Sequence, residues 1–532
     1  MRFFLTTLLL LGFSAIVSAQ SYTQRFNTLD IQHYKLSIEV NDTTNIINAT
    51  AVVSIKFKKI VNDFELDLIA IDSITKMGMK VDTVYQNKIL TDFSQTENKL
   101  RIKTKHVFPK LPYTYTIKYS GIPKDGLIIS ENLYGDRTFF GDNWPNRAQN
   151  WFPCVDHPSD KATVEYIIKA PNYYQVIANG FEIEETNISN KYKQYHYQTT
   201  APLPTKVMVI GIAKFAVQNI GETHNIPVSS WVYPQTKDKG FYDYAIAKDI
   251  LSFFIENIGD YPFLKLANVQ SKTRFGGMEN AGNIFYFEKS ITGAQDHKDL
   301  IAHEIAHQWF GNSVTEIDWK HIWLSEGFAT YLTDLYILNS DGEEAFLQRL
   351  KDERTKVLNF SKQELTPVVN PHIKDLMNLL NPNSYQKGAW CLHMLKNEIG
   401  TDNFWKGIKT FYKFYKFQNA STDDFKQVME QVSGKNLDIF FSQWLYKPGH
   451  PILKSTWIHG ASKLRIIIEQ SQKVAFQFPL DLEIVYSNGS SEIKTINVTS
   501  QKDPFVIPTK DLDVKEIKYD PNTNLLFEMA TK

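Results

Sequence analysis

Residues 299–330 read DLIAHEIAHQWFGNSVTEIDWKHIWLSEGFAT and contain the pattern His-Glu-x-x-His at His303, Glu304 and His307. In an α-helix, residues four positions apart lie on one face about a turn apart, so both imidazole rings can bind one metal ion. Two histidines at this spacing, with a glutamate beside the first, are typical of a zinc site. The stretch therefore predicts a helix that carries most of a hydrolytic zinc centre.

A catalytic zinc site has three protein ligands and keeps one position for water, whereas a structural site uses four. Glu326 is our candidate for the third ligand, because it follows His307 after eighteen residues at the start of a second helical run. We predict one zinc ion per chain, bound by His303, His307 and Glu326. Glu304 would act as general base, taking a proton from the attacking water and passing it to the leaving amine.

A second candidate segment precedes this helix and consists of Gly276, Gly277, Met278, Glu279 and Asn280. Its glycines permit close approach of the backbone to an extended peptide, as when a peptide adds a strand to a sheet edge. The carboxylate of Glu279 could pair with a substrate ammonium group. On the residues alone, an ordinary turn is the alternative interpretation.

Strand patterns come before the zinc region. Residues 34–40 and 113–119 alternate apolar and polar side chains, as half-buried strands do. Together with similar runs they predict a large antiparallel β domain over residues 20–235. Nothing in this part of the sequence has the spacing of metal ligands.

The period becomes helical near Lys239, and strands return after Lys447. We predict a mostly helical catalytic domain over residues 236–447 and a small β-sandwich over residues 448–532. The expected helices are Phe241–Ile258, Gln295–Phe310, Leu324–Ser340, Glu343–Leu358, Ser384–Ile399, Asp402–Phe417 and Thr422–Val432.

Length and composition are consistent with this division. A chain of 532 residues, 43% of them hydrophobic, is long enough for about three domains. Lys and Arg number 58, as do Asp and Glu, so the overall charge gives no support for a nucleic-acid partner. Cys154 and Cys391 are the two cysteines, and buried free thiols are favoured over a disulfide between them.

The N-terminus has the pattern of a secretory signal. Arg2 precedes an apolar run from Phe3 to Val17, and small residues lead to Ala19. This predicts a signal peptide over residues 1–19; an uncleaved anchor is the alternative. Because no later stretch is apolar over the length that spans a bilayer, we expect no membrane span in the mature chain. The expected location is periplasmic or extracellular.

Together, the segment Gly276–Asn280, the His303-Glu304-x-x-His307 pattern and Glu326 resemble the gluzincin zinc aminopeptidases typified by aminopeptidase N. Further similar stretches run along the chain in the family's order: residues 152–158, 259–263, 323–329, 443–445 and 449–451. The resemblance implies a multidomain α+β fold with a saddle-like antiparallel β domain, a thermolysin-like catalytic domain and a small C-terminal β-sandwich.

The resemblance also implies roles for individual residues. Glu279 would bind the free α-amino group of the substrate, which makes peptides with a free N-terminus the substrates. Tyr385 matches the family tyrosine that donates a hydrogen bond to the tetrahedral oxyanion. A phenol suits this role, because its ordinary pKa near 10 keeps it protonated at neutral pH.

Three features depart from the family pattern. Gly277 stands where the family usually carries alanine. Asn143 or Trp144 takes the place of a glutamine or glutamate that serves many members as a second amine anchor. Many relatives end in a large helical domain that closes over the active site, and no segment here is long enough for it, so we expect a more open cleft.

Other functions remain open at this point. The same zinc core could serve a metalloendopeptidase, which has no use for an amine anchor at Glu279. A non-catalytic peptide-binding relative could keep the scaffold, and epoxide hydrolysis is known in one branch of the family.

Overall fold

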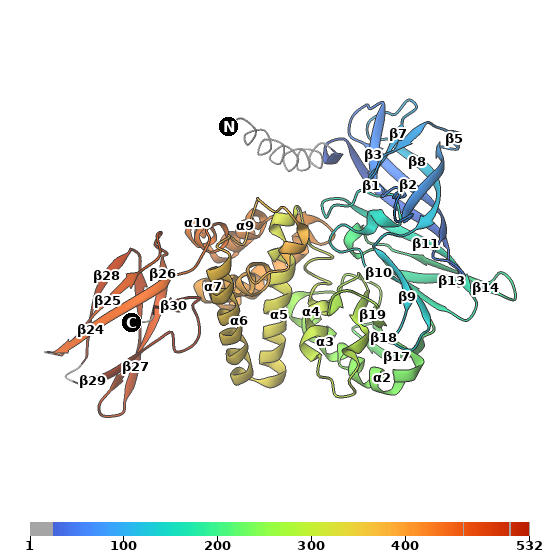
Figure 1. Ribbon diagram of the computed structural model, residues 1–532. Helices are drawn as coiled ribbons and strands as arrows, with labels where there is room; N and C mark the ends of the chain where they lie inside the picture. The colour runs from blue at the N-terminus through green and yellow to red at the C-terminus, as the bar shows by residue number, and fades with distance from the viewer. Residues whose placement is uncertain (1–24, 461, 510–511, 531–532) are drawn as a thin grey trace, which may run out of the picture. The chain divides into compact units, whose positions relative to one another are not determined.

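The computed structural model describes residues 25–460, 462–509 and 512–530. The chain forms two compact units (Figure 1). The first extends to Trp319 and includes Tyr415–Ala420, and the second comprises Lys320–Phe414 and the chain from Ser421 onward. The predicted signal peptide, residues 1–19, lies outside the described residues. Within the described ranges, no helix has both the length and the apolarity needed to cross a bilayer.

The N-terminal part of the first unit is built from strands whose side chains alternate between buried and partly exposed, as the sequence predicted. Its nine-stranded sheet has the order β13-β14-β11-β1-β2-β8-β4-β5, with β15 beside β11. All pairs are antiparallel except β1 with β11, which run parallel. The strands are β1 (Leu29–Glu39), β2 (Ile47–Phe57), β4 (Gly78–Gln86), β5 (Ile89–Leu90), β8 (Pro112–Ile122), β11 (Lys161–Pro171), β13 (Phe181–Asn187), β14 (Tyr192–Gln198) and β15 (Leu203–Pro204).

Two smaller sheets complete this β-rich part. One has the order β3-β7-β6 and the other β12-β16-β10-β9. Their strands are β3 (Asp63–Asp67), β6 (Phe93–Gln95), β7 (Lys99–Lys103), β9 (Leu127–Glu131), β10 (Arg137–Gly141), β12 (Gln175–Ala178) and β16 (Ile210–Ala213).

A five-stranded mixed sheet follows, with the order β17-β18-β19-β21-β20. Its central strands β18, β19 and β21 run parallel, and every residue of β19 is buried, as is typical of parallel strands covered on both faces. Strands β19, β20 and β21 lie in the part of the sequence predicted to be mostly helical, because short runs buried on both faces show no alternation. The strands are β17 (Ala216–Thr223), β18 (Ile226–Val232), β19 (Leu266–Ser271), β20 (Gly277–Met278) and β21 (Asn283–Phe287).

The first unit has three α-helices in this part of the chain: two lie between β18 and β19 in the sequence, and the third follows β21. The single helix predicted over Phe241–Ile258 is divided into α2 (Lys237–Ala245) and α3 (Ala247–Ile258). The helix predicted over Gln295–Phe310 is α4 (Lys298–Ala306), which ends four residues earlier. A short parallel pair, β22 (Thr315–Glu316) with β23 (Asn419–Ala420), ties residues 415–420 to this unit.

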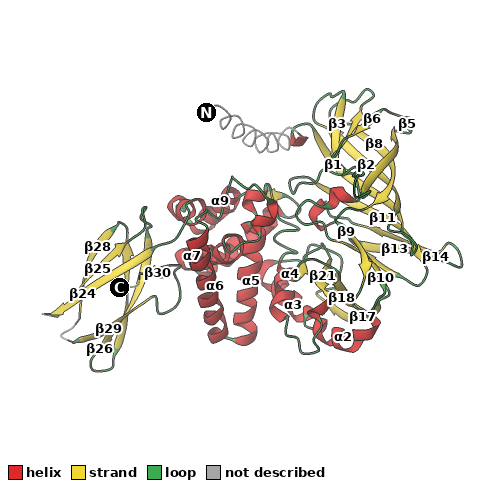
Figure 2. Cartoon of the chain, in the orientation of Figure 1, coloured by secondary structure: helices red, strands yellow, loops and turns green. Residues whose placement is uncertain are grey.

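The second unit begins with helices (Figure 2), and each one predicted there is present. One differs in form, because residues 383–387 make a π-helical turn before α7 rather than its first α-helical turn. The capping box of Ser421 and Asp424 begins α9. The helices are α5 (Trp323–Asp341), α6 (Glu343–Gln363), α7 (Gly388–Ile399), α8 (Thr401–Tyr415), α9 (Thr422–Ser433) and α10 (Asp438–Phe441).

Two sheets form the C-terminal part of this unit, with the orders β28-β25-β24-β30 and β27-β26-β29. They are made of β24 (Ile452–Gly460), β25 (Lys463–Gln470), β26 (Phe478–Tyr486), β27 (Ser491–Val498), β28 (Lys502–Pro508), β29 (Val514–Tyr519) and β30 (Glu528–Met529). The predicted α+β class, with a β-rich N-terminal part, a helical middle and C-terminal sheets, is confirmed. Cys154 and Cys391 are buried free thiols, as predicted. The domain boundaries at residues 235 and 447 stay predictions.

Candidate active site

Helix α4 presents His303 and His307 on one face. The buried residues Ile301, Ala302 and Ile305 pack the other side of the helix into the core. His307 directly follows the last residue of α4 but keeps helical dihedral angles (φ −57°, ψ −23°), so the four-residue spacing still aligns the two rings. Their Nε2 atoms lie 3.1 Å apart. The geometry predicted from the spacing is therefore present.

A main-chain carbonyl orients the ring of His307. Its Nδ1 lies 3.1 Å from the carbonyl oxygen of Phe310, which can only accept a hydrogen bond. Nδ1 therefore carries the donated proton, and the neutral ring keeps its lone pair on Nε2, the atom that faces His303. Metal-binding histidines are commonly held by a second hydrogen bond of this kind.

Glu326 lies in the first turn of α5 and is buried. Its carboxylate and the two histidines form a group whose ligand atoms all lie within 4.8 Å of one another. Tetrahedral zinc with bonds of about 2.1 Å to nitrogen holds two nitrogen ligands about 3.4 Å apart, close to the separation of the two Nε2 atoms. Two imidazoles and one carboxylate are a ligand set of catalytic zinc sites. The residues present fit a zinc ion.

Glu304 lies on the same helix and approaches strand β20. A β-carbon added to Gly277 would lie 2.3 Å from Oε1 of Glu304 and 2.5 Å from its carboxyl carbon. Only a residue without a side chain leaves room for the carboxylate in this position. The structure thus places the predicted base directly against the predicted substrate segment.

Glu279 is a buried residue, 5% exposed, and the Oε1 of its carboxylate has no hydrogen-bond partner among the residues that the structure describes. A buried carboxylate without a partner is costly, and it indicates a site for a cationic group. The neighbouring Met278 and Asn280 are buried, and β20, which contains Gly277 and Met278, is the edge strand of its sheet.

Two side chains that the sequence analysis did not identify hold the main chain at Glu279. The Nε2 of Gln308 and the Nδ2 of Asn312 donate to the carbonyl oxygen of Glu279, at 2.9 and 2.6 Å. Gln308 also accepts a hydrogen bond from the main-chain N–H of Gly282 at 2.9 Å. Gln308 directly follows His307. A polar residue at this buried position was the one feature of the sequence that could have indicated its role.

A buried carboxylate, that of Asp142, holds the main chain just before the segment Gly276–Asn280. Asp142 accepts a hydrogen bond from the main-chain N–H of Arg274 at 3.1 Å. It also forms an ion pair with Arg147 at 2.7 Å. The side chain of Arg274 in turn pairs with Asp125 at 2.8 Å. Burial raises the pKa of Asp142, while the Arg147 guanidinium opposes that shift. The role of Asp142 was not predicted from the sequence.

Asn143 and Trp144 have distinct surroundings. The amide of Asn143 donates to the carbonyl oxygens of Thr205 and Met208 at 2.9 and 2.6 Å, and its Oδ1 accepts from the Trp151 indole at 2.8 Å. These bonds occupy Asn143 in the core. The buried ring of Trp144 packs edge-on against Phe275, with 5.7 Å between ring centroids. Of the two, Trp144 is the one that packs beside the residue directly preceding the Gly276–Asn280 segment.

Tyr385 lies in the π-helical turn Asn383–Lys387, partly exposed. This turn packs against the start of α5, because a β-carbon on Gly327 would lie 2.8 Å from the Cα of Gly388 and 3.2 Å from the carbonyl oxygen of Ser384. The close approach brings the turn next to the residue that follows Glu326. π-helical turns of this kind are frequent at functional sites.

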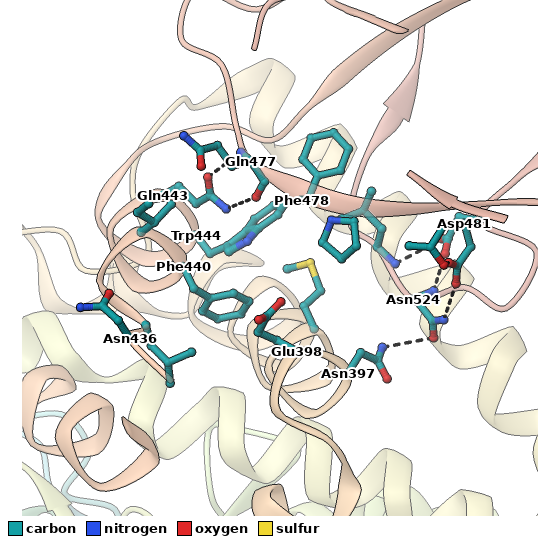
Figure 3. A pocket seen from close by; sticks show the side chains of 17 residues that line it. Asn397, Glu398, Asn436, Phe440, Gln443, Trp444, Gln477, Phe478, Asp481 and Asn524 are labelled. Carbon is teal, nitrogen blue, oxygen red and sulfur yellow. Dashed lines mark hydrogen bonds between the residues drawn. The ribbon is translucent and has the colours of Figure 1, made fainter. Parts of the chain in front are cut away.

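A cavity of about 540 Å³ lies in the second unit (Figure 3) and contains none of the predicted site residues. Its polar walls are engaged within the protein. The side chain of Gln443 exchanges hydrogen bonds with the main chain of Gln477 at 2.6 and 2.8 Å, and Asp481 accepts from Thr495 at 2.6 Å. The cavity therefore gives no support for a second catalytic site.

Comparison with known proteins agrees with the geometry. The model of the peptidase family M1 domain matches residues 242–444, and that of the peptidase M1 N-terminal domain matches residues 31–207. These matches include all five residues proposed for zinc binding, proton transfer and oxyanion stabilisation.

Individual relatives are more distant. A leucyl aminopeptidase of Saccharolobus solfataricus is 24% identical over 88% of this chain and 60% of that protein. The human glutamyl aminopeptidase is 27% identical over 67% of this chain and 40% of that protein. A probable aminopeptidase 2 of Sulfurisphaera tokodaii is 28% identical over 70% of this chain and 48% of that protein. The chain thus aligns with less than two thirds of the length of these relatives. The matches to both family domains, together with the His-His-Glu group, show that the chain belongs to peptidase family M1, the gluzincin aminopeptidase family that its motifs resemble.

Proposed function

We propose that this chain is a zinc aminopeptidase that hydrolyses the N-terminal residue from peptides. The observation that carries the proposal is the carboxylate of Glu279, which is buried and has an oxygen without a hydrogen-bond partner in the described chain. It lies in the segment that contacts Glu304 through Gly277. A substrate ammonium group would supply the missing partner, and only a peptide with a free N-terminus carries that group next to its first peptide bond.

His303, His307 and Glu326 would hold the zinc ion. When bound, zinc acts as a Lewis acid that polarises the scissile carbonyl and lowers the pKa of water. Glu304 then takes the proton from the attacking water and delivers it to the nitrogen of the leaving peptide. Glu279 holds the α-amino group, and this fixes the first peptide bond as the one that meets Glu304.

Two further features support this arrangement. Strand β20 is an edge strand, so an extended peptide can pair with its main chain, and the fixed backbone at Glu279 supports that pairing. Tyr385 would donate its phenolic hydrogen to the oxygen that becomes negative in the transition state. Such a donor acts only on the reacting carbonyl, so its loss should lower kcat more than it raises KM.

The decisive experiment compares one peptide with a free α-amino group and the same peptide N-acetylated, each assayed with and without a chelator. We expect rapid release of the first residue from the free peptide, no release from the acetylated one, and loss of activity with the chelator. Equal turnover of both peptides would identify a metalloendopeptidase. Binding of zinc with no hydrolysis of either peptide would identify a non-catalytic relative.

We also propose that the protein is exported to the periplasm or the extracellular space, on the basis of the N-terminal sequence. Mass determination of the protein isolated from the periplasmic and culture fractions tests this proposal. The expected mature chain begins at Gln20. A chain that retains residues 1–19 in the membrane fraction would instead support an uncleaved anchor.

A further inference from the structure

Three loops at one end of the nine-stranded sheet combine lysines with exposed apolar side chains. They are residues 57–60, 87–90 and 105–111, which we call the lysine loops. The first loop follows β2, the second contains β5, and the third leads into β8; all three strands are labelled in Figure 1. The loops contain five exposed lysines and no aspartate or glutamate. The five are Lys58, Lys59, Lys88, Lys105 and Lys110.

Main-chain and side-chain hydrogen bonds hold the lysine loops together as one surface. The main-chain N–H of Lys110 donates to the carbonyl oxygen of Phe57 at 2.9 Å. Gln86, at the end of β4, exchanges two hydrogen bonds with the main chain of Lys105, at 2.6 and 2.8 Å. The ammonium group of Lys105 also donates to the carbonyl oxygen of Leu90. The three loops are therefore fixed next to one another.

The apolar residues of these loops are unusually exposed for their size. Five of them are between 53% and 67% exposed: Ile60, Ile89, Leu90, Phe108 and Leu111. Two are the whole of β5, a strand at the edge of the sheet with both residues exposed. Isolated exposed apolar residues are ordinary, but a cluster on adjoining loop tips indicates an interaction surface.

The charge of this surface is also distinctive. Across the whole chain the 58 basic residues are balanced by 58 acidic ones, whereas the lysine loops are basic only. Within the described residues none of the five lysines forms an ion pair. The ammonium groups of Lys58 and Lys105 donate to the carbonyl oxygens of Phe26 and Leu90, whereas those of Lys59, Lys88 and Lys110 are available to a negatively charged partner.

From this combination we infer that the lysine loops bind the surface of an anionic lipid membrane. Lysines attract the negative head groups, and apolar side chains between them enter the boundary between head groups and acyl chains. A soluble polyanion would be attracted by the lysines alone and would leave Ile60, Ile89 and Phe108 exposed to water. The apolar residues therefore favour a lipid surface as the partner.

Sedimentation with vesicles tests this inference on the full-length protein. Vesicles of phosphatidylcholine are compared with vesicles that contain one third phosphatidylglycerol, at low and at high salt. We expect binding to the anionic vesicles only, weakened by salt. A triple variant Lys59→Gln, Lys88→Gln and Lys110→Gln should bind about 100-fold more weakly, at about fivefold per lysine.

Two further variants separate the contributions of charge and apolar contact. Ile89→Ser with Phe108→Ser keeps every lysine and should still weaken binding at least tenfold. Lys351→Gln, Lys406→Gln and Lys413→Gln remove three exposed lysines from helices α6 and α8 and should change nothing. Peptidase activity in solution should be equal in all three variants, which shows that they are folded.

The results that would overturn the inference are distinct. If the triple lysine variant and the helix control bind vesicles equally, the loops are not the binding surface. If the protein binds a sulfated polysaccharide through the lysine loops but does not bind the anionic vesicles, the partner is a soluble polyanion. Equal binding to neutral and anionic vesicles would exclude an electrostatic mechanism.

Discussion

The carboxylate of Glu304 occupies the space that a β-carbon on Gly277 would need, with 2.3 Å between Oε1 and the position of that carbon. Real contacts of this length do not occur, so any side chain at residue 277 forces Glu304 to move. The atom that must move is the end of a flexible side chain, so the fold itself would be little disturbed. The base of the proposed mechanism, however, would change position.

We therefore expect Gly277→Ala to lower kcat about 10- to 100-fold with little change in thermal stability or bound zinc, because displacement of a catalytic group by about 1 Å has effects of this size. Gly276→Ala is the matched control, since its β-carbon would meet only the Leu300 methyl groups at 3.7 and 3.9 Å. Steady-state kinetics of both variants decide the point. Equal activity of the two would mean that Glu304 reaches a productive position with alanine at 277.

Glu304 and Glu326 should respond differently to the same change. Glu304→Gln removes a base that is not a ligand, so we expect kcat to fall about 10²- to 10⁴-fold while one zinc ion per chain stays bound. Glu326→Gln replaces a ligand and should lower zinc content together with activity. Metal analysis after dialysis, paired with activity on the same samples, distinguishes the two. Full activity of Glu304→Gln would refute its role as base.

Glu279→Gln tests the amine anchor. The substitution keeps the shape but removes the charge, and a hydrogen bond to a charged group is worth about 1.5–3 kcal/mol. We expect kcat/KM for peptides with a free α-amino group to fall about 10- to 100-fold. Bound zinc should stay at one ion per chain, because Glu279 is not a ligand. A loss of zinc together with activity would instead indicate that the substitution disturbs the zinc site.

The stability of the second unit should depend on the pH through His393. Burial lowers the pKa of His393 to about 4, and the neutral ring is held between the Tyr331 hydroxyl and the carbonyl oxygen of Thr523, each at 3.1 Å. The unfolded chain, with an ordinary histidine pKa near 6.5, binds more protons between these values. The free energy of unfolding should therefore fall as the pH drops from about 6.5 to about 4, by up to about 3 kcal/mol.

Denaturation of the metal-free protein across this pH range measures the effect without interference from zinc release. His393→Gln does not titrate and should show a flatter profile between pH 6.5 and 4. His372→Gln, at an exposed position, should follow the original protein. Parallel profiles for all three proteins would assign the acid sensitivity to other groups.

Much of this architecture was predictable because it depends on local periodicity. The alternation in β1 and β8 and the helices α5 to α9 were expected at close to their observed positions, and strands were expected over the C-terminal part of the chain. The strands β19 to β21 were not, since a run buried on both faces has no alternation to distinguish it from a helix. The π-helical turn at 383–387 also escaped prediction, because the helical period of the sequence does not distinguish a π-helical turn from an α-helical one.

The candidate site likewise contains residues that were predictable from local spacing and residues that were not. Spacing on a helix was enough to propose His303, Glu304 and His307, because the relative positions of residues four apart are set by the helix itself. The hydrogen bonds of Gln308 and Asn312 to Glu279, of Arg274 to Asp142, and of Asn143 to Thr205 and Met208 join residues that are 29 to 132 positions apart. No local pattern encodes such contacts.

Gly277 illustrates the difference between what the sequence determines and what the tertiary structure determines. As a sequence position it was a small departure from a family motif, with no predicted effect on the backbone. The tertiary structure gives the departure a role, because α4 brings a carboxylate to the one place where a missing β-carbon leaves room for it. The identity of each group follows from the order of residues along the chain. The distance between them follows from how helix and strand pack, since excluded volume acts between atoms in space regardless of their separation in sequence.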